Sequence, residues 1–168
     1  MPALRLPPDV EAVIREFYTC ELTTVNKQGQ PVTWPTLPYY HQAEGQIIVT
    51  ASIAFAVKTY NARRHPQVAL LYSDPTGARL DSPPAVLVQG DATVREVTDN
   101  PPWSLEIFKT SVRRQPDSRK YIGNPIARRL FEFYFQRLAI IIRPRRILAW
   151  PRGSFGDAPV EIEVAHVE

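Results

Sequence analysis

The chain has 168 residues, of which 44% are hydrophobic, and a formal net charge of only +3. This length and apolar content suffice for one domain with one substantial core. No apolar run, 138–142 included, is longer than five residues, far fewer than the roughly 18 that cross a bilayer. Cys20 is the single cysteine, which excludes internal disulfides and cysteine-based zinc clusters.

We therefore predict a single domain spanning residues 1–168, with a core of about 19–150 and a C-terminal tail of 151–168. The N-terminus lacks the basic-then-apolar order of a secretory signal, so we expect a cytoplasmic protein without membrane association.

The first predicted element is a short amphipathic helix. Apolar residues recur at i, i+3, i+4 and i+7 from Val10, and Asp9 is its predicted N-cap. Two extended segments, 19–26 and 31–40, then flank Gly29, which supplies the positive φ that a short hairpin loop needs. A third strand at 46–50 completes a meander.

From residue 54 onward, predicted helices and predicted strands are mixed. Residues 54–64 are compatible with a helix that His65-Pro66 ends. Strands follow at 67–72, 85–94 and 137–150. Gly90 in the middle of a strand predicts a bulge or a tight bend.

Asn-Pro pairs predict helix starts near 101–113 and 125–134. Helices do not alternate with strands as a doubly wound sheet requires. The sequence therefore predicts a mainly β protein with short helices (α+β), its six strands closed into a small antiparallel barrel.

A phosphate site is predicted where the third strand ends. Thr50 and Ser52 supply hydroxyls, and Lys58 lies at the start of the next helix, where backbone N–H groups are free. Several short donors and one compact cation are what a phosphate dianion needs. The alternative is ordinary capping by Ser52 with a solvent-facing Lys58.

Other sites have little support. There is no G-x-G-x-x-G and no G-x-x-x-x-G-K phosphate loop, and no nucleophile elbow is visible. His41, His65 and His166 lie far apart, so no metal site is expected. No residue can be assigned as a catalytic acid or base.

The stretch 113–152 holds ten arginines and Lys120 against two acidic residues. It predicts a basic surface, either a solvated helix face or part of an interface. Nucleic acid is not an expected partner, because no base-reading module is present.

An ordered series of motifs resembles the pyridoxamine 5′-phosphate oxidase-like FMN-binding split barrels. Its most specific part is a lysine, then a helix with paired basic residues, then X-Pro-X-Val opening a strand. The matching segments are Leu22-Thr23-Thr24-Val25-Asn26, Gly29-Gln30-Pro31-Val32, Ile47-Ile48-Val49-Thr50, the run from Lys58 to Leu70, and Gln89-Gly90-Asp91-Ala92.

The resemblance implies a six-stranded antiparallel split β-barrel that acts as a homodimer with two flavin sites at the interface. It places the flavin phosphate at Lys58, Thr50 and Ser52. In the family one strand runs beside the isoalloxazine ring, and it corresponds here to Thr33, Trp34, Pro35 and Thr36. The final strand brings an aromatic residue near the cofactor, and that position corresponds to Trp150.

Two positions depart from the oxidase itself, which has an arginine where this chain has Val57 and another where it has Trp34. The oxidase residues that bind the substrate phosphate have no match in the C-terminal part, so that enzyme's own reaction is not expected. For Trp34 and Trp150, a structural role in the core or at a dimer interface has the same weight as the cofactor role.

The leading hypothesis is an FMN-dependent oxidoreductase acting on a small planar substrate. One alternative is a reductase using the 8-hydroxy-5-deazaflavin coenzyme, whose acidic tail the arginine-rich segment would hold. The other is a non-enzymatic flavin or haem carrier. A homodimer is also expected because the apolar strand 138–142 needs cover.

Overall fold

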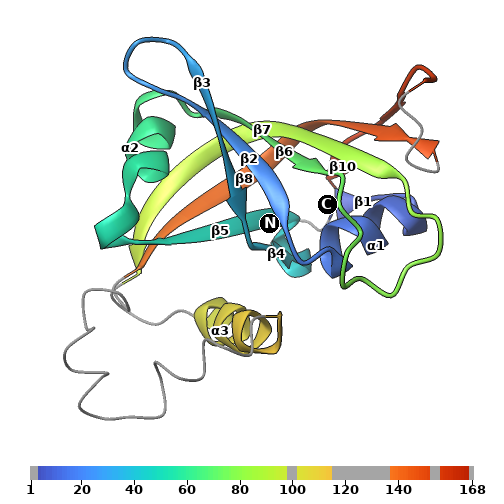
Figure 1. Ribbon diagram of the computed structural model, residues 1–168, viewed down its shortest axis with the longest axis horizontal. Coiled ribbons are helices and arrows are strands. Elements are labelled where there is room, and N and C mark those ends of the chain that lie inside the picture. The colour runs from blue at the N-terminus through green and yellow to red at the C-terminus, as the bar shows by residue number, and fades with distance from the viewer. Residues whose placement is uncertain (1–3, 98–101, 115–136, 152–155, 167–168) are drawn as a thin grey trace.

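A long, curved antiparallel sheet dominates the protein (Figure 1). The computed structural model describes residues 4–97, 102–114, 137–151 and 156–166. Within them one sheet has eight strands, ordered β3-β2-β6-β7-β8-β5-β4 with β9 on β8, and β1 pairs separately with β10. The strands are β1 Leu4–Arg5, β2 Cys20–Val25, β3 Pro31–Thr36, β4 Pro38–His41, β5 Gln46–Ser52, β6 Gln67–Tyr72, β7 Ala85–Val97, β8 Arg137–Trp150, β9 Val160–Ile162 and β10 Ala165–His166.

Three α-helices surround this sheet in the described part of the chain. Helix α1 (Pro8–Glu16) packs against β4 and β7, α2 (Val57–Arg64) against β2, β7 and β8, and α3 (Pro102–Arg114) against β4. Two short 3₁₀ turns, Gln42–Glu44 and Ile53–Phe55, follow β4 and β5. The predicted helix at 125–134 lies outside the described residues.

The expected strand 31–40 is in fact two strands, which corrects the predicted count of six. β3 pairs with β2 and β4 pairs with β5, and only Leu37 separates them. Both are edge strands, as suits Pro35 and Pro38, which have no N–H to donate to a neighbour. Residues 160–162 of the tail add the eighth strand.

The interruption between β3 and β4 also allows the sheet to close into a barrel. β3 and β4 stand at the two ends of the strand order yet follow one another in the chain, so the two edges must approach each other (Figure 1). The barrel interior is filled by alternate residues of the strands, among them Leu22, Val49, Leu70 and Ile140. Phe17, at the end of α1, meets Tyr72 edge-on there.

Two local predictions have different outcomes. Helix α1 begins at Pro8, so Asp9 is not the N-cap; it lies in the first turn, where an acidic side chain still favours the helix dipole. The bulge at Gly90 is confirmed. The β7–β8 register shifts between Gln89 and Gly90, where β8 carries an extra residue, Arg145.

No helix in the described part of the chain is long and apolar enough to span a membrane. Strand 138–142, expected to need cover from a partner, is already buried within this chain. It lies between β5 and β7, and Ile140 and Ile142 belong to the core.

Candidate functional site

The candidate phosphate site lies where β5 ends. Ser52, the last residue of this strand, is buried, and its hydroxyl accepts a hydrogen bond from the backbone N–H of Ala54 at 3.3 Å. Ser52 therefore caps the following 3₁₀ turn, as the capping alternative predicts. Thr50 lies two residues earlier on the same face of the strand and is partly exposed.

Lys58 departs from that alternative because it is not a simple solvent-facing lysine. It lies in the first turn of α2 and is half-buried. Burial is the larger cause of its lowered pKa, and the positive charge of Arg137 lowers this pKa further. An ammonium group held in a partly buried place beside a second cation is stabilised when an anion joins them.

Arg137 is the residue that sequence analysis missed. It begins β8, and its Cα partner in the antiparallel ladder is Ser52. Residues directly opposite in such a ladder project from the same face of the sheet. Thr50, Ser52 and Arg137 thus share one face of the sheet, and the charge of Arg137 acts on Lys58. We call these four residues the phosphate corner. Only the β5–β8 register brings Arg137 there, since 85 residues separate it in sequence from Ser52 (137 − 52).

The four residues predicted beside the flavin ring are divided between two faces of β3. Thr33 and Pro35 lie opposite Thr23 and Glu21, and Trp34 and Thr36 lie opposite Leu22 and Cys20. Leu22 and Cys20 belong to the core, so Trp34 and Thr36 share the interior face. A flat ring lying along one face would contact only one of the two pairs.

The hydroxyls of this strand are engaged within the β2–β3 hairpin. Thr33 shares a hydrogen bond of 2.9 Å with Thr23, and the buried Thr36 donates to the carbonyl oxygen of Cys20 at 3.2 Å. Thr36 also precedes Leu37 and Pro38, and Pro38 is the Cα partner of Val49. The end of β3 therefore approaches the phosphate corner, whereas Thr33 lies farther away along the strand.

Trp34 has an unsatisfied donor. Its indole Nε1 is buried and has no hydrogen-bond partner among the described residues. A buried donor without an acceptor is costly, so such a group requires an explanation. A ring nitrogen or carbonyl oxygen of a bound ligand is the kind of acceptor that would satisfy it.

Trp150 is not brought to the phosphate corner of its own chain. It ends β8, the 14-residue strand that Arg137 begins. At about 3.3 Å per residue, roughly 40 Å of strand separates the two residues. One FMN molecule does not span that distance, so Trp150 and Lys58 of one chain do not contact the same cofactor.

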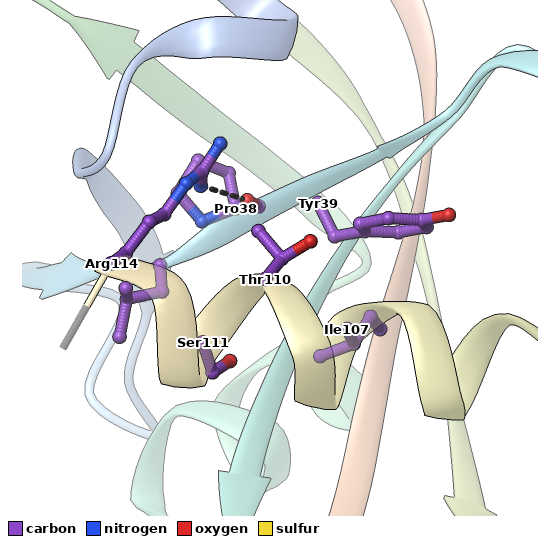
Figure 2. Close-up of a pocket in the computed structure, with 7 residues that line it drawn as sticks. Pro38, Tyr39, Ile107, Thr110, Ser111 and Arg114 are labelled. Atoms are coloured by element: carbon purple, nitrogen blue, oxygen red, sulfur yellow. Dashed lines mark hydrogen bonds between the residues drawn. The ribbon is translucent and has the colours of Figure 1, made fainter. Parts of the chain in front are cut away.

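A small cavity lies between β4 and α3 (Figure 2). The Arg114 guanidinium donates to the carbonyl oxygen of Pro38 at 2.9 Å and to that of Arg15 at 2.9 Å, which holds α3 against β4 and α1. The cavity volume of about 10 Å³ leaves room for about one water molecule. It is lined by Leu37, Pro38, Tyr39, Ile107, Thr110, Ser111 and Arg114.

This cavity is far too small for a flavin ring. The phosphate corner is the candidate site because of the chemistry of its own residues. Its residues fit a phosphate ester, since they combine two cations with two hydroxyls. The residues described include no cluster of three His, Cys, Asp or Glu side chains that would hold a metal ion.

Solved structures share this fold at low sequence identity. An F420 reductase is 20% identical, with a TM-score of 0.57, covering 84% of this chain and 98% of that one. General Stress Protein 26 from Bacillus anthracis is 16% identical, with a TM-score of 0.57 and coverages of 85% and 92%. HutZ, the haem storage protein from Vibrio cholerae, is 18% identical, with a TM-score of 0.52 and coverages of 85% and 93%.

No curated protein matches the sequence. The family model of pyridoxamine 5′-phosphate oxidase matches residues 6–148, which is most of the chain. The mostly antiparallel barrel described above agrees with that family's split-barrel fold. By this match, the chain belongs to the pyridoxamine 5′-phosphate oxidase family.

Proposed function

We propose that the protein is an FMN-binding oxidoreductase that acts on a small planar substrate. The observation that carries the proposal is the phosphate corner, where the half-buried Lys58 feels the repulsion of Arg137, the Cα partner of Ser52. A phosphate dianion placed there replaces this repulsion with two charge-assisted contacts. The lack of a dinucleotide motif favours a mononucleotide over a dinucleotide.

In this proposal the chain binds and orients the cofactor. Lys58 and Arg137 offset the charge of the phosphate, and Thr50 and Ser52 supply hydroxyls. Bound FMN supplies the hydride or electron transfer, while the protein sets its position and electrostatic surroundings. We assign no proton donor to any residue.

The absorption spectrum of the purified protein tests the cofactor directly. After incubation with FMN and desalting, we expect a retained flavin band at about 450 nm, because the phosphate corner slows release. A protein that stays colourless with FMN contradicts the proposal. A Soret band in that sample indicates the haem carrier instead, the alternative to which the similarity with a haem storage protein points.

The deazaflavin alternative is favoured by one further observation. Arg95 of β7 is the Cα partner of Ala139, which is itself the partner of Thr50. Arg95, Thr50 and Arg137 therefore project from one face of the sheet, and the positive charge extends beyond a single phosphate. The F420 coenzyme is a deazaflavin with an acidic tail, which this face would attract. Tight F420 binding without FMN binding selects this function.

The pH dependence of binding checks Lys58 independently. A bound phosphate raises the lowered pKa of Lys58, so binding takes up a proton once the free lysine begins to deprotonate. FMN affinity should therefore fall as the pH rises through the pKa of the unliganded lysine. In Lys58→Arg the guanidinium stays charged, and this loss should disappear. The measurement is FMN titration across alkaline pH, with riboflavin as the reference for ring ionisation.

We also propose that the protein works as a homodimer. The segment next to Lys58 exposes four large apolar side chains, and Phe55 is 66% exposed. Contiguous exposed apolar residues usually mark a contact surface. A second chain also supplies the Trp150 that the first chain cannot bring to its own phosphate corner. The exposed residues are Ile53, Phe55, Val57 and Tyr60.

Light scattering at micromolar concentration should give the mass of two chains. Obligate dimers typically bury more than about 2,000 Å², so they stay associated at this concentration. Phe55→Ser is the matched variant, since it removes the most exposed of the four side chains without disturbing the core. It should shift the protein toward the monomer. A monomeric wild-type protein rules out this arrangement.

A further inference from the structure

A chain of buried hydrogen bonds joins the helix that carries Lys58 to the strand that carries Trp34. The Asn61 side-chain amide of α2 donates to the hydroxyl oxygen of Thr24 in β2 at 3.1 Å. The Thr24 hydroxyl in turn lies 3.4 Å from the carbonyl oxygen of Val32 in β3 and donates to it. Thr24 is 0% exposed and Asn61 4%, so water does not compete for these groups.

This series of hydrogen bonds is the main polar contact between α2 and the sheet in the described structure. The helix has only eight residues, too few to be stable without tertiary contacts, and no side chain caps its start. Its ion pair between Arg63 and Glu96 is exposed, and such pairs contribute little. Thr59 bonds only within the start of the helix, to the carbonyl oxygen of Ala56.

Asn61 is well placed to control Lys58. The two residues are three positions apart on α2, so their side chains are neighbours on one side of the helix. A rotation or slide of α2 that breaks the Asn61–Thr24 bond also moves the Lys58 ammonium group. The bond therefore sets the position of the cation relative to Ser52 and to β3.

We propose that Thr24 and Asn61 are positioning residues for the phosphate corner. They touch no ligand; they hold α2 at the distance from β2 and β3 at which Lys58 meets the phosphate. This inference rests on the proposed FMN binding, which it deepens by naming the residues that set the strength of the phosphate contact.

Two matched variants separate positioning from stability. Thr24→Val keeps the shape of the side chain but removes the hydroxyl, and Thr24→Ser keeps the hydroxyl but removes a methyl group. Both should lower the melting temperature. Only Thr24→Val should lower the ratio of FMN affinity to riboflavin affinity, by about five- to tenfold, because only this variant releases Lys58.

Flavin fluorescence titration of the purified protein gives this ratio for wild type, both variants, Lys58→Ala and the double variant Lys58→Ala/Thr24→Val. We expect the double variant to have the same ratio as Lys58→Ala alone, since Thr24 acts through the lysine. Additive losses overturn the inference, and so does a Thr24→Val ratio equal to that of the wild type. A Lys58→Ala ratio equal to that of the wild type instead contradicts the proposed phosphate site.

A second readout needs no ligand. Amide hydrogen exchange of residues 57–64 should be faster in Thr24→Val than in Thr24→Ser, because the valine leaves α2 without its buried polar anchor. Equal exchange in the two variants overturns the inference even if FMN does not bind.

Discussion

Lys58→Ala is expected to lower the affinity for FMN by about ten- to a hundredfold and to leave riboflavin binding nearly unchanged. A charge-assisted hydrogen bond contributes roughly 1.5 to 3 kcal/mol, and riboflavin lacks the phosphate that would form it. Arg137 remains in the variant, so some attraction for the phosphate persists. The measurement is a pair of titrations, with FMN and with riboflavin, on both proteins.

Arg64→Ala is the matched control for this variant. Arg64 is an exposed cation of the same helix, at its last turn instead of its first. Its loss should change FMN affinity only through weak surface electrostatics, by less than about fivefold. Equal FMN affinity in wild type and Lys58→Ala would refute the phosphate corner, even in a protein that binds flavin through its ring.

Gly90→Ala should lower the free energy of unfolding by about 3 kcal/mol or more, a large loss for the addition of one methyl group. A Cβ at this position would lie 2.3 Å from the carbonyl oxygen of Arg143, which is backbone and cannot rotate away. The two long strands β7 and β8 would have to separate locally. Urea denaturation of wild type and variant measures the effect.

Gly29→Ala provides the comparison, because its added Cβ would meet no atom within 4 Å. Its φ of +80° is the only source of strain, which amounts to about 1 to 2 kcal/mol. If Gly90→Ala is no less stable than Gly29→Ala, then β8 does not approach β7 as closely as described.

Local sequence signals account for much of the fold and for part of the candidate site. The hairpin at Gly29 and the bulge at Gly90 were predictable because each depends on one glycine. Gly29 adopts a positive φ, and Gly90 leaves room for the backbone of β8. Ser52 and Lys58 were predictable because a strand end and a helix start are adjacent in sequence. The division of 31–40 was not predicted, although Pro35 and Pro38, which have no N–H to donate, lie on either side of Leu37.

What the sequence by itself determined is the family, the antiparallel β-rich fold, and those residues of the candidate phosphate site that lie close together along the chain. What only the tertiary structure decided is how distant segments combine. Strand pairing places Arg137 opposite Ser52, and Trp150 lies at the other end of the strand that Arg137 begins. The packing of α2 on β2 lets Asn61 reach Thr24. The physical reason is that register depends on the pairing of whole strands, so no local pattern around Arg137 or Thr24 encodes it.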